Sequence, residues 1–124
     1  MKECRIVIGG CRNFNNYDFF KRCADECIFK LPKNIKITIV SGHCRGVDSL
    51  AERYAKENDY KLDIFPADWE KYGRAAGPIR NEKMVASAQV VLALWDYKSK
   101  GTKNLIENAQ LFKRKLFIVK INQI

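Results

Sequence analysis

The sequence of 124 residues lacks any apolar run long enough to cross a membrane. It also lacks the shape of a signal peptide, because residues 1–4 lead directly into a strand-like segment. Internal repeats, low-complexity tracts and interdomain linkers are missing as well. We therefore expect a cytoplasmic protein with no membrane partner, made of one domain over residues 1–124.

The chain also lacks a recognisable metal-binding pattern. None of its five cysteines form a CxxC pair, and His43 is the single histidine. Cys23 and Cys27 lie one helical turn apart and His43 adjoins Cys44, but this spacing fits no structural zinc class. We expect no metal and no cofactor, and interpret the cysteines as reduced thiols, several of them buried.

Positive charge is abundant, with 23 Lys and Arg against 14 Asp and Glu, a net charge of +9. Such a field attracts polyanions and small anionic ligands alike. The basic residues are spread along the chain, however, and do not alternate with aromatic residues in one segment. A solvated basic surface therefore fits the pattern at least as well as a nucleic-acid-binding face.

Apolar runs and helical periodicities alternate along the chain. Strands are predicted for 4–8, 35–40, 62–65, 90–95 and 116–121. Helices are predicted for 17–29, 46–58, 78–88 and 102–113, with Pro78 as the first residue of its helix and an irregular segment over 66–77. This order predicts a three-layer α/β, Rossmann-like fold whose five-stranded, mainly parallel sheet carries helices on both faces.

Three glycine-bearing turns, 8–12, 41–48 and 99–102, each follow a predicted strand and open a predicted helix. Glycines let backbone N–H groups approach a ligand, and helix N-termini carry partial positive charge, so such turns bind phosphate or other anions. In a parallel sheet these turns and the segment 68–80 should meet beyond the carboxyl ends of the strands. The sequence therefore predicts one site for a nucleotide-like ligand.

Side chains near the turns fit the same ligand. Arg12 could add a bidentate donor to the first turn. Asp48 could bind ribose hydroxyls or only complement a helix dipole, and Thr102 is a candidate N-cap. Trp69 offers a face to a base, and Glu107 is a candidate catalytic carboxylate, although solvated helix glutamates are commoner. The candidate ligand-binding residues are Gly9, Gly10, Arg12, Asn13, Phe14, Ser41, Gly42, Arg45, Gly46, Asp48, Trp69, Arg80, Asn81, Gly101 and Thr102, and the catalytic candidates are Arg80, Asp48 and Glu107.

The assembled segments resemble the SLOG superfamily, and specifically its YspA/cpYpsA-related branch. The resemblance runs nearly end to end and rests on the blocks 8–14, 41–48, 65–69, 72–84 and 101–107. It implies a Rossmann-like domain for nucleotides or nucleotide-derived molecules, including ADP-ribose-type signals. Many relatives occur in bacterial and phage conflict systems, and the branch largely lacks an established activity.

Distant relatives, the LOG-type phosphoribohydrolases, cleave nucleoside monophosphates with an arginine from R-K-x-x-M and a glutamate from G-G-x-G-T-x-x-E. Arg80 and Met84 match the first pattern, but the position three after Thr102 is Leu105. Glu107 is five residues after Thr102, which on a helix turns it away from that direction. Cleavage of the LOG kind therefore lacks its carboxylate unless Asp48 or Asp68 substitutes.

Three functions follow from these observations. The first is binding of a phosphate-bearing nucleotide-derived small molecule, for sensing or sequestration, without turnover. The alternative is a nucleotide N-glycosidase, and the second alternative is a basic nucleic-acid-binding protein. We also expect a homo-oligomer, because short Rossmann-like domains often associate through their outer helices.

Overall fold

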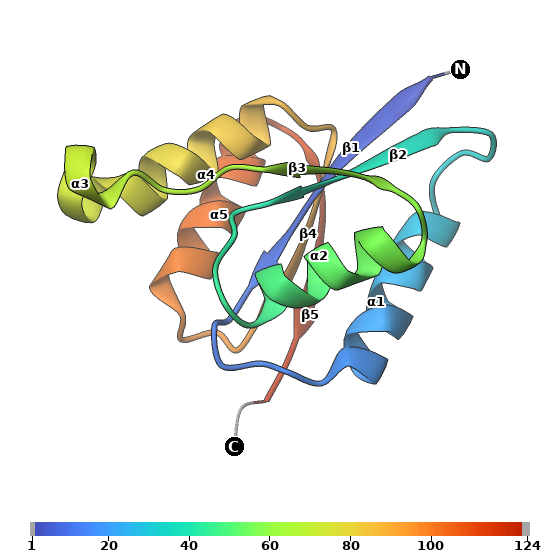
Figure 1. The fold of residues 1–124 in the computed structure, drawn as a ribbon, viewed down its shortest axis with the longest axis horizontal. Helices are drawn as coiled ribbons and strands as arrows, with labels where there is room; N and C mark the ends of the chain where they lie inside the picture. Colours follow the sequence, from blue (N-terminus) through green and yellow to red (C-terminus); the bar gives the residue numbers. More distant parts are fainter. Residues whose placement is uncertain (1, 123–124) are drawn as a thin grey trace.

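The computed structural model describes residues 2–122 and shows a three-layer α/β architecture (Figure 1). Its strands are β1 (Glu3–Gly10), β2 (Lys36–Ser41), β3 (Lys61–Ile64), β4 (Val90–Trp95) and β5 (Lys115–Lys120). Its helices are α1 (Tyr17–Phe29), α2 (Val47–Glu57), α3 (Trp69–Tyr72), α4 (Ala76–Ala86) and α5 (Lys100–Leu111), with a short 3-10 helix, η1, at Gly73–Ala75. The strands form one sheet in the order β3-β2-β1-β4-β5, and every neighbouring pair is parallel. The predicted Rossmann-like fold is confirmed.

The central strand β1 is buried on both faces of the sheet. Successive side chains of a strand point to opposite sides, so Ile6 and Ile8 face one helical layer and Val7 faces the other. Ile6 and Ile8 pack in a core with residues of α1 and α2, whereas Val7 packs with residues of α4 and α5. Figure 1 shows these two helix pairs on opposite sides of the sheet.

The start of α5 differs from the prediction. Ser99 is its N-cap and Lys100 its first residue, so Thr102 is the third helical residue and the prediction of Thr102 as the cap is wrong. The Ser99 hydroxyl lies 3.1 Å from the Thr102 hydroxyl and makes no hydrogen bond to the helix backbone. Ser99 and Thr102 are both residue types that cap helices, so the sequence alone did not decide between them.

The start of α4 and the preceding segment also differ. α4 begins at Ala76, two residues before Pro78. Proline is tolerated in this position because the backbone N–H groups of the first helical turn have no intrahelical acceptor. The segment 66–77, predicted as irregular, contains α3 and η1. The Asp68 side chain caps α3 by accepting a hydrogen bond from the backbone N–H of Lys71 at 3.1 Å.

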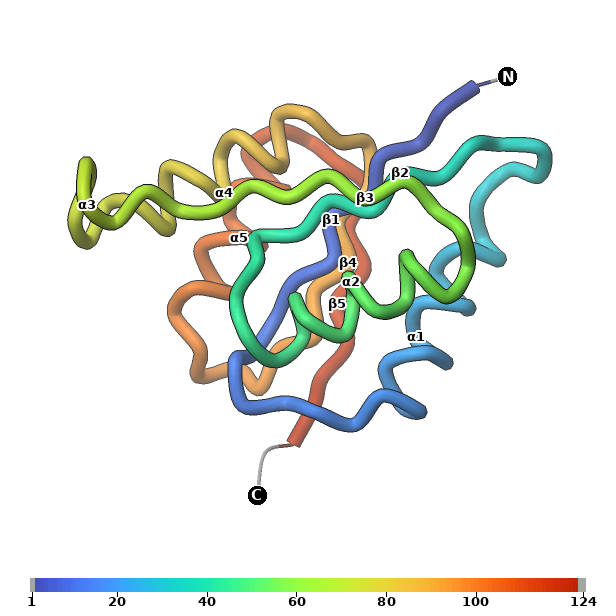
Figure 2. Tube along the Cα trace, in the orientation of Figure 1, coloured from blue at the N-terminus to red at the C-terminus, as the bar shows by residue number. Residues whose placement is uncertain are grey.

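The strand order places a topological switch point between β1 and β4. From β1 the chain continues to α1 on one face, and from β4 it continues to α5 on the other. Ligands of open α/β sheets bind at such a point, beyond the carboxyl ends of the strands. Figure 2 shows the chain leaving β3 toward α3, at the end of the molecule remote from α1, before it returns along α4. None of the helices within residues 2–122 combines the length and apolarity needed to cross a membrane.

Candidate functional site

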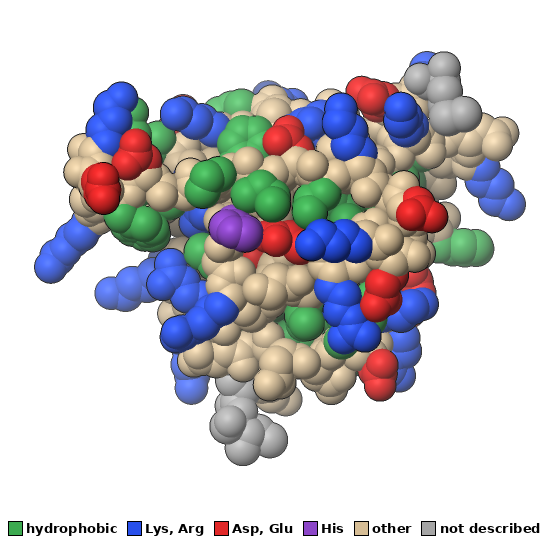
Figure 3. Space-filling view, viewed as in Figure 1, with side chains coloured by type: hydrophobic (Ala, Val, Ile, Leu, Met, Phe, Trp, Pro, Cys, Tyr) green, Lys and Arg blue, Asp and Glu red, His purple; other side chains and the backbone are tan. Residues whose placement is uncertain are grey.

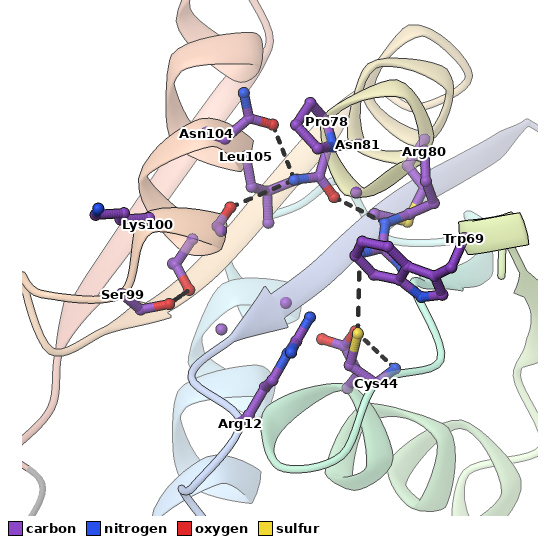
Figure 4. Close-up of a pocket in the computed structure, with 17 residues that line it drawn as sticks. Arg12, Cys44, Trp69, Pro78, Arg80, Asn81, Ser99, Lys100, Asn104 and Leu105 are labelled. Atoms are coloured by element: carbon purple, nitrogen blue, oxygen red, sulfur yellow. Dashed lines mark hydrogen bonds between the residues drawn. The ribbon is translucent and has the colours of Figure 1, made fainter. Parts of the chain in front are cut away.

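A cavity of about 430 Å³ opens at the switch point, between the carboxyl end of β1 and the helices α2, α4 and α5. Volumes of this size are typical of small-molecule sites. Figure 4 shows the residues that surround it. They are Gly9, Gly10, Arg12, Cys44, Asp48, Trp69, Gly77, Pro78, Arg80, Asn81, Met84, Ser99, Lys100, Gly101, Thr102, Asn104 and Leu105.

The last residues of β1 form the floor of the cavity. A Cβ atom at Gly9 would lie 2.9 Å from Leu105 Cδ2 and 3.5 Å from Asp48 Oδ1, so both side chains approach the space that a side chain at position 9 would fill. A Cβ at Gly10 would overlap the Leu94 carbonyl of the neighbouring strand. Both glycines are therefore needed for close packing, and the same lack of side chains opens the floor to a ligand.

Asp48 is a buried carboxylate in the cavity wall, 7% exposed. One of its oxygens, Oδ2, accepts a hydrogen bond from the backbone N–H of Cys44 at 3.1 Å. Burial raises the pKa of Asp48 to about 6, opposed by the Cys44 N–H and the nearby Arg80 guanidinium and reinforced by Glu52. At neutral pH the group is mostly ionised, so the cavity contains a negative charge that the fold accommodates at a cost.

Arg80 is buried and connects two elements of the site. Its guanidinium donates to the Gly42 carbonyl at 2.5 Å and to Asn81 Oδ1 at 2.9 Å, and it lies 3.8 Å from Cys44 Sγ. The amide of Asn81 in turn donates to the Gly101 carbonyl at 3.3 Å. Arg80 thus fixes the turn between β2 and α2 against α4, and Asn81 fixes α4 against the start of α5.

Arg12 is the cavity's exposed guanidinium. It makes no hydrogen bond or ion pair with any residue in the described range 2–122, in contrast to Arg80. In Figure 4 Arg12 points toward the space between Trp69 and Ser99. Its donors are therefore available to an anion in the cavity.

The N-terminus of α5 borders the cavity without a side-chain cap, whereas the Asn16 side chain caps α1. Lys100, Gly101 and Thr102 all line the cavity, and amides in a first helical turn have no intrahelical acceptor. These N–H groups and the helix dipole favour an anion at this end.

The opposite end of the cavity is apolar and aromatic. Trp69, 51% exposed, extends from α3 toward α4, where its Cη2 atom lies 3.4 Å from the position that a Cβ on Gly77 would occupy. Pro78 and Met84 line the same region. This end offers a flat surface of the kind on which a nucleobase stacks.

Several residues predicted for the site lie outside the cavity lining. Phe14 is buried against Phe19, with ring centroids 6.0 Å apart, and Ser41 is buried and donates to Glu52 at 2.8 Å. Glu107 is exposed on α5, as its rotation from Thr102 suggested. The predicted residues that do not line the cavity are Asn13, Phe14, Ser41, Gly42, Arg45, Gly46 and Glu107.

Gly46, in the second glycine-bearing turn (41–48), is required by the fold. Its φ of +78° lies in the left-handed region, and a Cβ there would overlap the backbone carbonyls of Cys11 and Arg12. Because Gly46 has no side chain, the loop that follows β1 can pack closely against it. The sequence could not show whether this glycine makes room for a backbone segment or for a ligand.

Other lining residues were missed by sequence reasoning: Cys44, Gly77, Pro78, Met84, Ser99, Lys100, Asn104 and Leu105. Ser99 and Lys100 lie in the glycine turn 99–102, which the sequence had already indicated as an anion-binding turn. Met84 and Asn104 lie one helical turn or less from predicted residues, so the helical period would have found them.

The cysteines are free, and Cys4, Cys11 and Cys27 are buried. Burial raises the pKa of Cys27 to about 11, which keeps its thiol protonated. Within residues 2–122 no group of three or more His, Cys, Asp or Glu side chains is placed to hold a metal ion.

The fold and site define a Rossmann-like domain with an anion-favouring cavity at its switch point. Residues 4–72 match the YspA, cpYpsA-related SLOG family, and the chain belongs to this family. The chain is also similar to the Gene 61 protein of Mycobacterium phage D29, at 36% identity over 113 residues, which is 86% of this chain and 88% of the phage protein.

Two solved structures share the fold at low sequence identity. DNA processing protein A (DprA) of Streptococcus pneumoniae has a TM-score of 0.73 at 17% identity over 98% of this chain, which spans about half (52%) of the DprA chain. DNA processing protein A of Helicobacter pylori, described for its single-stranded DNA binding mode, has a TM-score of 0.65 at 20% identity. The match covers 96% of this chain and 66% of the H. pylori chain.

Proposed function

We propose that the cavity binds a phosphate-bearing, nucleotide-derived small molecule, such as an ADP-ribose-type signal, without hydrolysing it. The observation that carries this proposal is the polarity of the cavity. The uncapped start of α5 and the Arg12 guanidinium favour an anion at one end, while Trp69 provides an aromatic face at the other. Membership of a SLOG family supports the same ligand class.

Asp48 gives the ligand a direction in this proposal. A carboxylate repels phosphate but accepts hydrogen bonds from hydroxyl groups, so it suits a ribose between the base and the phosphate. Its Oδ1 atom lies close to Gly9, and both residues line the cavity. Phosphate at α5, ribose at Asp48 and base at Trp69 is the arrangement that satisfies each group.

The absence of turnover in the proposal rests on Leu105. This apolar side chain lines the cavity at the position where the resembling phosphoribohydrolases have their glutamate, and it is buried over Gly9. Glycosidic cleavage needs a carboxylate near the anomeric carbon or its attacking water. Asp48 is the carboxylate within the cavity lining, and the proposal gives it the ribose hydroxyls.

Calorimetric titration with AMP, NAD and ADP-ribose tests the proposal, followed by chromatography of each bound ligand. We expect Arg12→Ala to weaken binding by tenfold or more, because a hydrogen bond between charged groups contributes roughly 1.5–3 kcal/mol. Arg45→Ala is the matched control, since Arg45 is an exposed arginine in the neighbouring turn and lies outside the cavity lining.

Two results would contradict the proposal. Equal losses in both variants would indicate a general charge effect and no site at Arg12. Recovery of free base and ribose phosphate would show turnover. Because position 105 is leucine, the reaction would then depend on a carboxylate elsewhere in the chain.

Single-stranded DNA is the second candidate ligand. Two observations favour it: the net charge of +9, and the structural similarity to the H. pylori protein described for its single-stranded DNA binding. On the face shown in Figure 3, lysine and arginine side chains are interspersed with acidic ones and do not gather into one continuous basic stripe. A steep loss of oligonucleotide affinity with increasing salt would support this candidate, because phosphate contacts release counterions.

A further inference from the structure

An exposed aromatic stack lies next to the cavity, and the function proposed above does not use it. Trp95 ends β4 and Tyr97 follows in the loop to α5, with ring centroids 4.3 Å apart and ring planes inclined by 25°. Trp95 packs against the core, whereas Tyr97 is 54% exposed. The pair therefore presents one aromatic ring to solvent from a rigid base.

The loop holds Tyr97 in an unusual conformation. Its φ of +65° is in the left-handed region, which an aromatic residue rarely adopts. Asp96 Oδ1 accepts hydrogen bonds from the N–H groups of Lys98 at 2.9 Å and Ser99 at 2.8 Å, and Trp95 Nε1 donates to the Ser99 carbonyl at 3.0 Å. Backbone conformations of this kind in non-glycine residues cluster at active sites and ligand clamps.

Tyr97 is close to the anion-favouring end of the cavity. Ser99 lines the cavity, and two consecutive peptide units place the Tyr97 and Ser99 Cα atoms at most about 7.6 Å apart. Trp69 lies at the opposite end of the same cavity, as Figure 4 shows. Tyr97 does not itself line the cavity, but it is two residues from Ser99, at the anion-favouring end and away from Trp69.

The surroundings of Tyr97 are basic. Lys98 and Lys120 are exposed, Lys120 Nζ lies 5.7 Å from the Tyr97 ring centroid, and Lys100 lines the cavity. Asp96 is the acidic neighbour, and one of its oxygens is engaged in the turn. An incoming base has to displace the Lys120 ammonium, but an exposed cation–π contact is weaker than stacking of a base on an aromatic ring.

We propose that Tyr97 is a second base-stacking site, and that the ligand has two nucleobases joined through the phosphate bound at α5. This inference rests on the proposed nucleotide function of the cavity. A pyrophosphate-bridged dinucleotide and the 5′ end of a nucleic-acid strand share this chemistry. Stacking faces combined with neighbouring positive charge are the general means by which proteins bind successive bases.

The test compares AMP with two ligands that carry a second adenine, P1,P2-diadenosine diphosphate and the 5′-phosphorylated dinucleotide pApA. Affinities are measured with the unmodified chain, Tyr97→Ala, Tyr97→Phe and Phe29→Ala. Phe29 is the control, because it is an exposed aromatic residue at the end of α1, outside the cavity lining. Circular dichroism verifies that each variant is folded.

We expect at least one of the two-base ligands to bind more tightly than AMP. Tyr97→Ala should weaken that ligand between about fivefold and about 150-fold while leaving AMP unchanged, because the alanine removes one base stack. Tyr97→Phe and Phe29→Ala should retain the tighter binding. Tighter binding of diadenosine diphosphate than of AMP indicates that the ligand is a soluble dinucleotide. Tighter binding of pApA alone indicates that the ligand is the end of a nucleic-acid strand.

A second base that adds no affinity in the unmodified chain would refute the proposal, as would a gain that survives in Tyr97→Ala. Either result, with AMP still bound, leaves the nucleotide function of the cavity intact. If none of the three ligands binds at millimolar concentration, both the cavity function and the second stacking site are wrong.

Discussion

Asp48→Asn is expected to make the folded protein more stable at neutral pH while impairing the site. Burial holds the pKa of Asp48 at about 6 in the folded protein, against an ordinary value of 3.8. The folded state therefore binds this proton more tightly than the unfolded state does. The contribution of Asp48 to wild-type stability consequently falls as pH rises from about 4 to about 6, and this loss persists at higher pH.

The size of the effect follows from the shift. About 2 pKa units correspond to about 3 kcal/mol at 1.36 kcal/mol per unit. Asp48→Asn recovers only part of this free energy. In the variant the Cys44 N–H donates to a neutral acceptor, and Arg80 no longer has a negative charge beside it. We expect a net gain of roughly 1–3 kcal/mol at pH 7.5, which moves the urea midpoint by roughly 1 M.

Urea unfolding of both proteins at pH 7.5 and pH 4 measures this difference, and other carboxylates largely cancel between the two chains. The gain should disappear near pH 4, where Asp48 is protonated in the wild type. Asp59→Asn is the matched control: Asp59 is exposed, and asparagine tolerates its φ of +54° equally well. A variant that is less stable than the wild type at pH 7.5, or a difference independent of pH, would refute the reasoning.

Further predictions concern packing and a buried hydroxyl. Gly10→Ala should lower the free energy of unfolding by several kcal/mol, because its Cβ would overlap the Leu94 carbonyl; Gly101→Ala meets open space in the first turn of α5 and should raise it by up to about 1 kcal/mol. The melting temperatures of the two variants test this expectation. Equal melting temperatures would show that the end of β1 can move to accommodate a Cβ at position 10. Tyr54→Phe should cost about 1 kcal/mol in urea unfolding, because the buried Tyr54 hydroxyl donates to Asp25 at 2.6 Å; an unchanged midpoint would mean that water replaces this contact.

The overall fold was predictable because its strongest signals are local. β4 has the predicted bounds Val90–Trp95, since a continuous apolar run is the pattern of a strand buried on both faces. α1 also has its predicted bounds, because Asn16 caps its start and Leu31-Pro32 follows its end. α3 was missed because a helix of one turn contributes too few residues for a period to emerge.

The site was less predictable, since its composition depends on which residues face one another. Leu105 lines the cavity only because α5 starts at Lys100 and packs its inner face over Gly9. Arg80 was a candidate for direct phosphate contact; in the fold it lines the cavity, but it also donates hydrogen bonds to the Gly42 carbonyl and to Asn81 Oδ1, a structural role that the sequence did not indicate. That engagement depends on the turn after β2 meeting α4, a contact between segments far apart in sequence.

The two arginines of the cavity therefore have separable roles. Arg80 is buried and hydrogen-bonded, so its removal would release the turn that carries the Cys44 N–H and with it the partner of Asp48. Arg12 is exposed and makes no hydrogen bond or ion pair in the described range, so its removal should leave the fold intact, although its positive charge also lowers the pKa of Asp48. Loss of ligand affinity in Arg12→Ala therefore reports on phosphate binding, whereas the same loss in Arg80→Ala is informative only together with a stability measurement. If the cavity binds the proposed ligand, the buried Asp48 carboxylate would favour a nucleotide over free phosphate. Phosphate alone gains from Arg12 and α5 but gives Asp48 no hydroxyl partner, while a ribose satisfies the oxygen that faces Gly9.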